Sequence, residues 1–276
     1  MAWKIELGNS VVYGICDGSV ARDPLEYLLG STPDDWATHA DALDQAGQMV
    51  NSFTCYLFDT GSELVLIDTG FGANAPEGMA AGFMPDELTS IGVSASDIRH
   101  VVFTHLHPDH VLGSLDANQD PFFVNATHWT LKREVDHWRS TDDQRAPRVL
   151  SVVEVLEGAG VLNPTDEPTP VLPGVERIAT YGHSPGHTSI RLSGGGDEVI
   201  VTGDLTWTPV QVDHPEWTSP FDGDPAEAAA TRARFLDEVT ASGTPFLAGH
   251  HPQPGFGRIV STSDGRRYEA LPVLDG

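Results

Sequence analysis

The feature that most constrains this chain is a short cluster of metal-binding side chains directly after an apolar strand. Residues 100–104 have the composition of a buried strand, and they lead into His105-Leu106-His107-Pro108-Asp109-His110. Side chains two positions apart in an extended chain point the same way, so His105 and His107 can face one ion. Pro108 turns the chain, which lets the two residues after it serve a second ion nearby. The sequence therefore predicts a metal site at the end of a strand.

Periodicity predicts further strands and several helices along the rest of the chain. Alternating or continuous apolar runs bounded by turn residues predict strands at residues 3–7, 11–16, 53–59, 64–68, 121–125, 188–192 and 199–202. Capping residues followed by proline predict helices that start near Asp23, Thr32 and Asp224, and an apolar face predicts another over residues 127–139. Strands and helices interleave without repeats. We therefore expect a layered α/β architecture in a single domain, residues 1–276.

Composition excludes several classes of protein. The chain has 40 acidic and 15 basic residues and a formal net charge of −25, so it repels nucleic-acid phosphates and anionic membranes. No stretch approaches the ~20 consecutive apolar residues of a membrane span, and residues 1–7 lack the apolar core of an export signal. Cys16 and Cys55 lie in strand-like segments and are expected as buried free thiols. We therefore expect a cytoplasmic protein with a small-molecule partner, and composition leaves a homodimer open.

The cluster at residues 104–110 resembles the signature of the metallo-β-lactamase superfamily, Thr-His-x-His-x-Asp-His after a buried strand. The resemblance extends over about residues 50–258 and implies a four-layer αβ/βα sandwich with two metal ions per chain. It assigns His105, His107 and His183 to one ion. It assigns Asp109, His110 and His250 to the other, with Asp204 as the bridging ligand. Nitrogen and oxygen ligands with open positions favour two Zn²⁺ ions, with manganese, cobalt and iron as alternatives.

The resemblance also implies roles for residues around the ligands. Asp68 matches an aspartate that orients ligand imidazoles in the family. Two close histidine pairs each offer two candidates, and family spacing selects His183 over His187 and His250 over His251. We expect His187 to have a supporting or packing role and His251 to lie at the rim of the site.

Pocket residues follow less directly from the sequence. His214 and two tryptophans lie soon after the bridging aspartate and are candidates to line the pocket, together with other large apolar side chains: Phe71, Phe83, Met84, Trp207, Trp217 and Phe256. The remaining histidines, His39, His100, His128 and His137, are expected on the surface or in helices.

The resemblance implies metal-assisted hydrolysis, in which a metal-bridging hydroxide attacks an electrophilic centre and Asp109 or Asp204 accepts or relays the proton. Residues 202–211 and 249–257 are similar to the branch of the superfamily that holds organophosphate hydrolases and lactonase-like enzymes. The homoserine-lactone lactonases of that branch carry a tyrosine three residues after the bridging aspartate, where this chain has Trp207. We expect hydrolysis of a small neutral ester-like substrate: a lactone, a carboxylic ester or a phosphotriester. The alternatives are hydrolysis of a β-lactam or other cyclic amide, and an iron-binding redox role on the same ligands.

Overall fold

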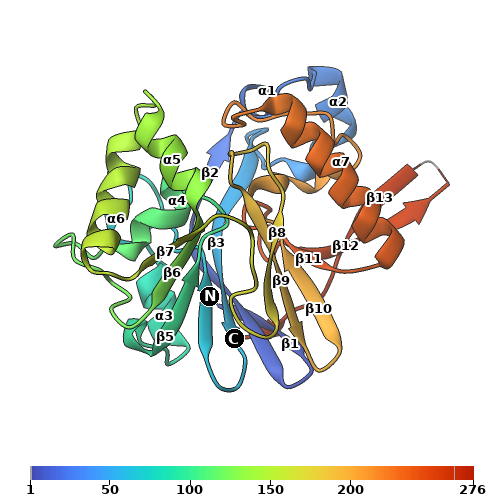
Figure 1. Cartoon of the computed structure of the whole chain (residues 1–276). Coiled ribbons are helices and arrows are strands. Elements are labelled where there is room, and N and C mark those ends of the chain that lie inside the picture. Colours follow the sequence, from blue (N-terminus) through green and yellow to red (C-terminus); the bar gives the residue numbers. More distant parts are fainter. Residues whose placement is uncertain (1, 264) are drawn as a thin grey trace.

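The computed structural model describes residues 2–263 and 265–276, which form two β-sheets packed face to face with helices outside them (Figure 1). In sheet order, the first sheet contains β14 (Leu274–Asp275), β1 (Trp3–Leu7), β2 (Ser10–Arg22), β3 (Met49–Asp59), β4 (Leu64–Ile67), β5 (Ile98–Val102), β6 (Thr127–Leu131) and β7 (Leu162–Thr165). The second contains β13 (Gly265–Ala270), β12 (Phe256–Thr262), β11 (Phe246–Leu247), β10 (Asp197–Val201), β9 (Thr188–Gly194) and β8 (Val175–Ala179).

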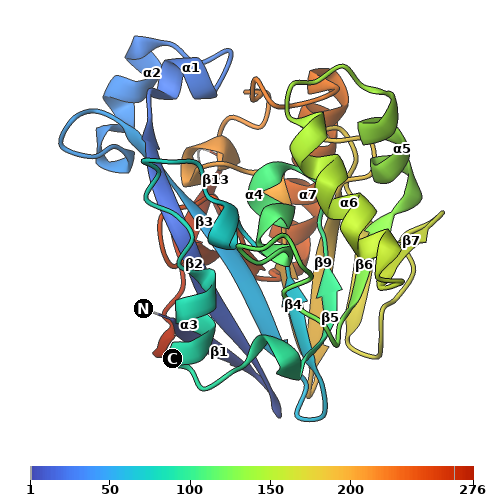
Figure 2. The same cartoon turned by 90° about the vertical axis from the view of Figure 1, so that its left-hand side faces the viewer.

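The α-helices are α1 (Pro24–Tyr27), α2 (Pro33–Thr38), α3 (Met84–Ser90), α4 (Pro108–Val111), α5 (Lys132–Ser140), α6 (Ala146–Gly158) and α7 (Pro225–Ser242). Short 3₁₀ turns lie at Ala40–Ala42, Gly72–Asn74, Ala95–Asp97, Leu112–Ser114, Gly203–Leu205 and Pro209–Val212. Helices α5 and α6 lie on one side of the paired sheets and α7 lies on the other (Figure 1), while α3 covers the first sheet nearer the chain ends (Figure 2). No helix of the described residues has the length and apolar character needed to cross a membrane.

Alternation of side chains along the strands builds a separate apolar core on each face of the first sheet. In β3, Cys55 and Leu57 pack toward the helices, whereas Tyr56 and Phe58 pack toward the second sheet. The outer face of the second sheet is covered by α7, whose Leu236 joins the core that contains strand residues Ile200 and Phe246. The expected four-layer αβ/βα sandwich is confirmed by this arrangement.

Local sequence signals explain the boundaries of α7. Asp224 is its N-cap and accepts a hydrogen bond from the backbone N–H of Glu227 at 3.0 Å. Gly243 ends the helix with φ of 74°, the left-handed conformation that glycine adopts without a steric penalty. The predicted extent, to about Ala241, is one residue short of the observed end at Ser242.

Two sequence-based predictions of secondary structure are wrong. Residues 121–125 form no strand, because Phe122 and Ala126 donate their backbone N–H groups to nearby loop carbonyls while the Phe123 side chain enters the core. The helix expected over residues 127–139 begins only at Lys132. The residues before it form β6, which pairs in parallel with β5 and β7. The apolar face of that helix was identified correctly, but residues 127–131 pair with neighbouring strands, so the helix starts later than predicted.

The burial of one histidine and of one cysteine also differs from expectation. His128 lies on β6 and is fully buried, rather than on the surface or in a helix, and burial lowers its pKa to about 4. Both cysteines are free thiols, as expected, but Cys55 is buried whereas Cys16 is only partly so.

The fold brings the loops that carry the candidate metal ligands to one edge of both sheets. Strands β4 and β5 run parallel and end there, as do β10 and β11, while the antiparallel β9 begins there. Backbone hydrogen bonds tie the two sheets together at this edge, from Thr188 N–H to the carbonyl of Thr104 and from Thr54 N–H to the carbonyl of Gly249. Loops from both sheets therefore meet over a common site.

Removal of the α7 N-cap tests how much Asp224 stabilises the helix. We expect Asp224→Ala to lower the free energy of unfolding by about 1 kcal/mol, because the first turn of α7 loses its side-chain acceptor. Asp224→Ser keeps an acceptor and should retain most of that stability. Urea unfolding of the three proteins measures the difference, and equal losses in both variants would contradict the capping role.

Candidate metal centre

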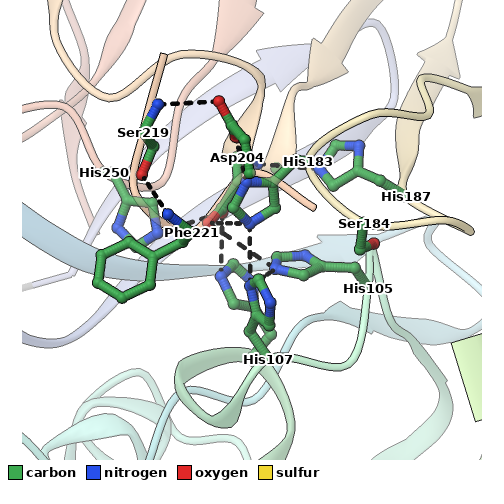
Figure 3. Close-up of polar contacts among 12 residues, drawn as sticks. His105, His107, His183, Ser184, His187, Asp204, Ser219, Phe221 and His250 are labelled. Carbon is green, nitrogen blue, oxygen red and sulfur yellow. Dashed lines mark hydrogen bonds and ion pairs between the residues drawn. The ribbon is translucent and has the colours of Figure 1, made fainter. Parts of the chain in front are cut away.

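Seven side chains with metal-binding atoms meet at the shared edge of the sheets. They form two groups in which the donor atoms all lie within 4.8 Å of one another. The first contains His105, His107, His183 and Asp204, and the second contains Asp109, His110 and His250. These are the seven residues selected from the sequence, divided between two sites as the family resemblance implies. Figure 3 shows the imidazoles of the first group converging on the Asp204 carboxylate.

Asp204 lies between the two groups. Its Oδ2 is 3.1 Å from His183 Nε2, and its Oδ1 is 3.0 Å from His110 Nε2 and 3.1 Å from His250 Nε2. Burial raises the pKa of this carboxyl, but the surrounding imidazoles outweigh burial and hold the pKa well below its ordinary value. Each carboxylate oxygen of Asp204 thus faces a different group of histidines.

The donor atoms fit metal ions better than they fit one another. His107 Nδ1 lies 2.9 Å from both His105 Nε2 and His183 Nε2, a crowding of three imidazole nitrogens. Ligands bound at the zinc–nitrogen distance around a tetrahedral ion lie about 3.3 Å apart, close to these separations. In the described part of the chain, three buried atoms at the second site make no hydrogen bond. They are Nε2 of His110, Nε2 of His250 and the Asp204 Oδ1 that faces these two histidines. A cation between them would satisfy all three.

Hydrogen bonds to Nδ1 orient both histidines of the second group and determine that Nε2 faces the centre. His110 Nδ1 lies 2.8 Å from Asp68 Oδ2, and His250 Nδ1 lies 2.8 Å from the carbonyl oxygen of Ser52. Both partners accept hydrogen bonds, so Nδ1 donates and Nε2 presents its lone pair to the centre. Asp68 also accepts from the backbone and hydroxyl of Thr104 and has a φ of 57°, a strained conformation typical of functional sites.

Two further buried carboxylates hold the first group, and the sequence analysis missed both. Asp222 Oδ1 lies 2.8 Å from His183 Nδ1, and its Oδ2 accepts from the N–H of Ser219. Glu134 accepts from the N–H of Leu106 and the N–H of Gly186, so it joins the two histidine loops. The sequence could have indicated Glu134, because this residue shares the apolar face of its helix with Trp138. Nothing in the turn around Asp222 indicated a role for that residue.

The second member of each histidine pair lies behind the donors. His187 Nδ1 lies 3.0 Å from the carbonyl oxygen of Thr180, and its Nε2 accepts from the backbone N–H of Asp204 at 3.0 Å. This contact requires glycine at position 203, where a Cβ would come 2.6 Å from His187 Nε2. Burial lowers the pKa of His187 to about 3 and that of His251 to about 3, so both stay neutral.

His251 is not at the rim, contrary to expectation. Its side chain is 1% exposed and its Nε2 lies 3.0 Å from the hydroxyl of Thr206. His214 does not reach the centre either: its ring stacks on Trp217 at 4.0 Å between centroids, and Glu216 lies 3.3 Å from its Nδ1. The sequence placed His214 soon after the bridging aspartate and His251 beside the ligand His250, but the fold directs both side chains elsewhere.

A cavity of about 220 Å³ opens beside the donors and has largely aromatic walls. It is lined by Arg22, Tyr27, Phe53, Phe71, His107, Pro108, Asp109, Arg145, Arg148, Asp204, Trp207 and Phe221. Trp207 stacks on His250 with 4.5 Å between ring centroids and an angle of 6°. The ring of Phe221, labelled in Figure 3, stacks against Trp207 with 5.9 Å between ring centroids.

Only some of the expected wall residues line this cavity. Phe71 and Trp207 do, whereas Met84 is buried in the helix-side core and Phe83 is exposed outside it. Phe256 lines a separate groove beside β1, and Trp217 packs against Trp36. The segment that contains Tyr27, which forms a wall, lies far from the metal motifs in sequence, so its role depended on tertiary packing.

Comparison with known proteins agrees with this geometry. Residues 52–250 match the model of the metallo-beta-lactamase superfamily. An N-acyl homoserine lactonase of Bacillus thuringiensis is 26% identical over an alignment of 215 residues that covers 71% of this chain and 80% of that protein.

Solved structures show the same fold along nearly the whole chain. AidC, a dizinc quorum-quenching lactonase in complex with a product, superposes with a TM-score of 0.91 at 24% identity, covering 99% of this chain and 98% of that one. The hydrolase AbOPH has a TM-score of 0.88 at 24% identity with the same coverage. Because the family model spans most of the sequence and the four-layer fold agrees with it, this protein belongs to the metallo-beta-lactamase superfamily.

Proposed function

We propose that the centre hydrolyses small ester-like substrates, and that cyclic esters, the lactones, are the preferred class. The observation that carries this proposal is the pair of donor groups that share Asp204 beside an aromatic cavity. The protein is a metal-dependent hydrolase of its superfamily, and relatives over much of its length are named as N-acyl homoserine lactonases. A lactone ring of a few apolar atoms and one ester group suits a cavity of this volume and lining.

We propose the seven donors as ligands of two ions, with zinc as the first choice. When bound, the ions would supply a water molecule acidic enough to attack near neutral pH and would polarise the ester carbonyl. The hydrogen bonds that the imidazoles donate to Asp68, Asp222 and the Ser52 carbonyl keep a lone pair of each partnered imidazole directed at the ions. Aromatic contacts of Trp207 and Phe53 with His250 keep bulk water from that side of the centre.

The two aspartates have different surroundings and therefore different roles. Asp204 is 1% exposed and surrounded by imidazoles, so it serves as the shared ligand. The Asp109 side chain is 19% exposed and lines the cavity, with Oδ2 3.6 Å from His250 Nε2. Asp109 is therefore placed to take the proton from the attacking water and return it to the alkoxide that leaves the opened ester.

A panel assay tests the substrate class directly. Homoserine lactones, simple lactones, p-nitrophenyl esters, a paraoxon-like triester and a chromogenic β-lactam should be compared by kcat/KM with the zinc-loaded protein. We expect lactones to give the highest values. A clear preference for the triester or the β-lactam would overturn the lactone assignment.

Metal content should determine activity. We expect two ions per chain after native purification, strong loss of hydrolysis after exhaustive chelation, and recovery with Zn²⁺, Co²⁺ or Mn²⁺. Elemental analysis and activity measured on the same samples check this. Active protein without transition metal would contradict the ligand assignment, and tightly held iron with redox activity would favour the alternative redox role.

Asp204→Asn should reduce turnover by roughly 10²–10⁴-fold, because the shared carboxylate loses its charge between the ions. Thermal unfolding should change much less, since the amide keeps the side-chain shape. The control is Asp197→Asn at the exposed start of β10, which removes the same charge far from the centre. Near-complete retention of rate in Asp204→Asn would mean that another carboxylate bridges the ions.

The paired histidines distinguish ligands from supporting residues. His183→Ala and His250→Ala should each lower metal occupancy and nearly abolish hydrolysis. Their neighbours, in His187→Ala and His251→Ala, should keep both ions with smaller kinetic effects, because their nitrogens face Asp204 N–H and Thr206 rather than the ions. The reverse pattern, with His187→Ala losing an ion and His183→Ala fully loaded, would refute the assignment.

A further inference from the structure

Among the described residues that line the substrate cavity, one arginine side chain has no hydrogen-bond acceptor. Arg22 is the last residue of β2 and lines the same cavity as His107 and Asp109. Its guanidinium carbon lies 4.8 Å from the centre of the Tyr27 ring. No hydrogen bond or ion pair joins the Arg22 side chain to another described residue, and its buried Nε lacks an acceptor. Such a donor is ready for a ligand, because buried polar groups are normally paired.

The other two arginines of the cavity differ from Arg22 in this respect. Arg145 makes a two-pronged contact with Asp143, in which Nε and a terminal nitrogen lie 3.1 Å and 2.6 Å from the same carboxylate oxygen. Arg148 donates to the backbone carbonyl of Asn74 at 2.6 Å. Both guanidinium groups therefore have an acceptor within the protein, which the guanidinium of Arg22 lacks among the described residues.

The charge around the cavity is opposite to that of the molecule. The chain carries 15 basic residues against 40 acidic ones, yet three arginines line this one cavity. Its two aspartates, Asp109 and Asp204, face the histidine donors, where the ions of the proposed function would more than neutralise them. The loaded cavity is therefore electropositive, which favours an anionic group on the substrate.

We infer that Arg22 binds a carboxylate carried by the substrate, so that the preferred substrates are lactones or esters with a free carboxylate apart from the scissile bond. This inference rests on the proposed function and makes its substrate class more specific. The planar guanidinium matches a carboxylate through two parallel hydrogen bonds, which a neutral carbonyl cannot form. A substrate with a carboxylate replaces the neutral substrate expected from the sequence, because the overall negative charge of the chain does not extend into this cavity.

The surroundings of Arg22 define the rest of such a substrate. Tyr27 packs edge-on against Trp207 and Phe221 at 5.4 Å and 5.3 Å, so the ring beneath Arg22 is fixed by its neighbours. The rest of the cavity lining is largely aromatic and includes these rings together with Phe53 and Phe71. The part of the substrate that links its carboxylate to the ester is therefore apolar.

Matched pairs of lactones test this inference. The two lactones of a pair share a ring and an apolar linker. In one the linker ends in a carboxylate, and in the other it ends in the primary carboxamide, which has the same shape without the charge. A series of pairs with longer linkers tests different distances from the ester to Arg22. We expect wild-type protein to prefer the carboxylates in kcat/KM. Arg22→Met should reduce the ratio of the two kcat/KM values by about 10- to 100-fold, as expected for a lost charge-assisted contact. Arg22→Lys, which keeps the charge without the fork, should give an intermediate ratio.

A control variant and a binding measurement separate the possible failures. Arg258 on β12 pairs with Glu269 away from the cavity, so Arg258→Met removes the same charge and should keep the wild-type ratio. Tryptophan fluorescence measures binding of a product-like dicarboxylate and its monoamide, with the dicarboxylate expected to bind more tightly to wild-type protein only. Equal hydrolysis of both lactones by wild-type protein overturns the inference and leaves the proposed function intact. If no lactone is hydrolysed, the proposed function fails, and the binding comparison alone decides the role of Arg22.

Discussion

The two sheets of this protein meet at one carboxylate. Asp204 follows a strand of the second sheet, His110 follows a strand of the first, and the atoms that face each other are 3.0 Å apart. Neither sheet carries a complete set of donors, so the centre exists only when the two sheets are packed together. The burial that brings the donors together also excludes water, which makes the charge on Asp204 costly unless cations surround it. Metal binding and packing of the sheets are therefore linked.

Three buried carboxylates behind the histidines hold the histidines and their loops in position. Asp68 follows β4, Glu134 lies on α5, and Asp222 lies in the loop before α7. Each accepts hydrogen bonds from backbone groups or a hydroxyl as well as serving a histidine or its loop. Asp222 is also 3.7 Å from the buried Arg232 of α7, whose guanidinium donates to the carbonyl of Leu205 beside Asp204. A helix on the outside of the sandwich thus supports two residues of the centre.

Local signals predicted those parts of the molecule that depend on neighbouring residues in sequence. The spacing of His105 and His107, the cap at Asp224 and the glycine at 243 each act through contacts within a few residues, and the structure agrees with them. The prediction was wrong where distant contacts decide the outcome. Residues 127–131 became a strand because strands on both sides pair with them. Met84 packs in a core rather than in the cavity because α3 lies against the first sheet.

The sequence by itself determined the metal-binding character of the centre, its family and the layered fold, because the clustered histidines and the alternation of apolar residues are short-range patterns. Tertiary structure decided what surrounds the metal donors. Glu134 and Asp222 hold the histidine loops, and Arg22 and Tyr27 reach the cavity from the end of β2 and from α1. These residues are far from the metal motifs along the chain. Their positions depend on how the sheets and helices pack, which the short-range patterns of the sequence do not encode.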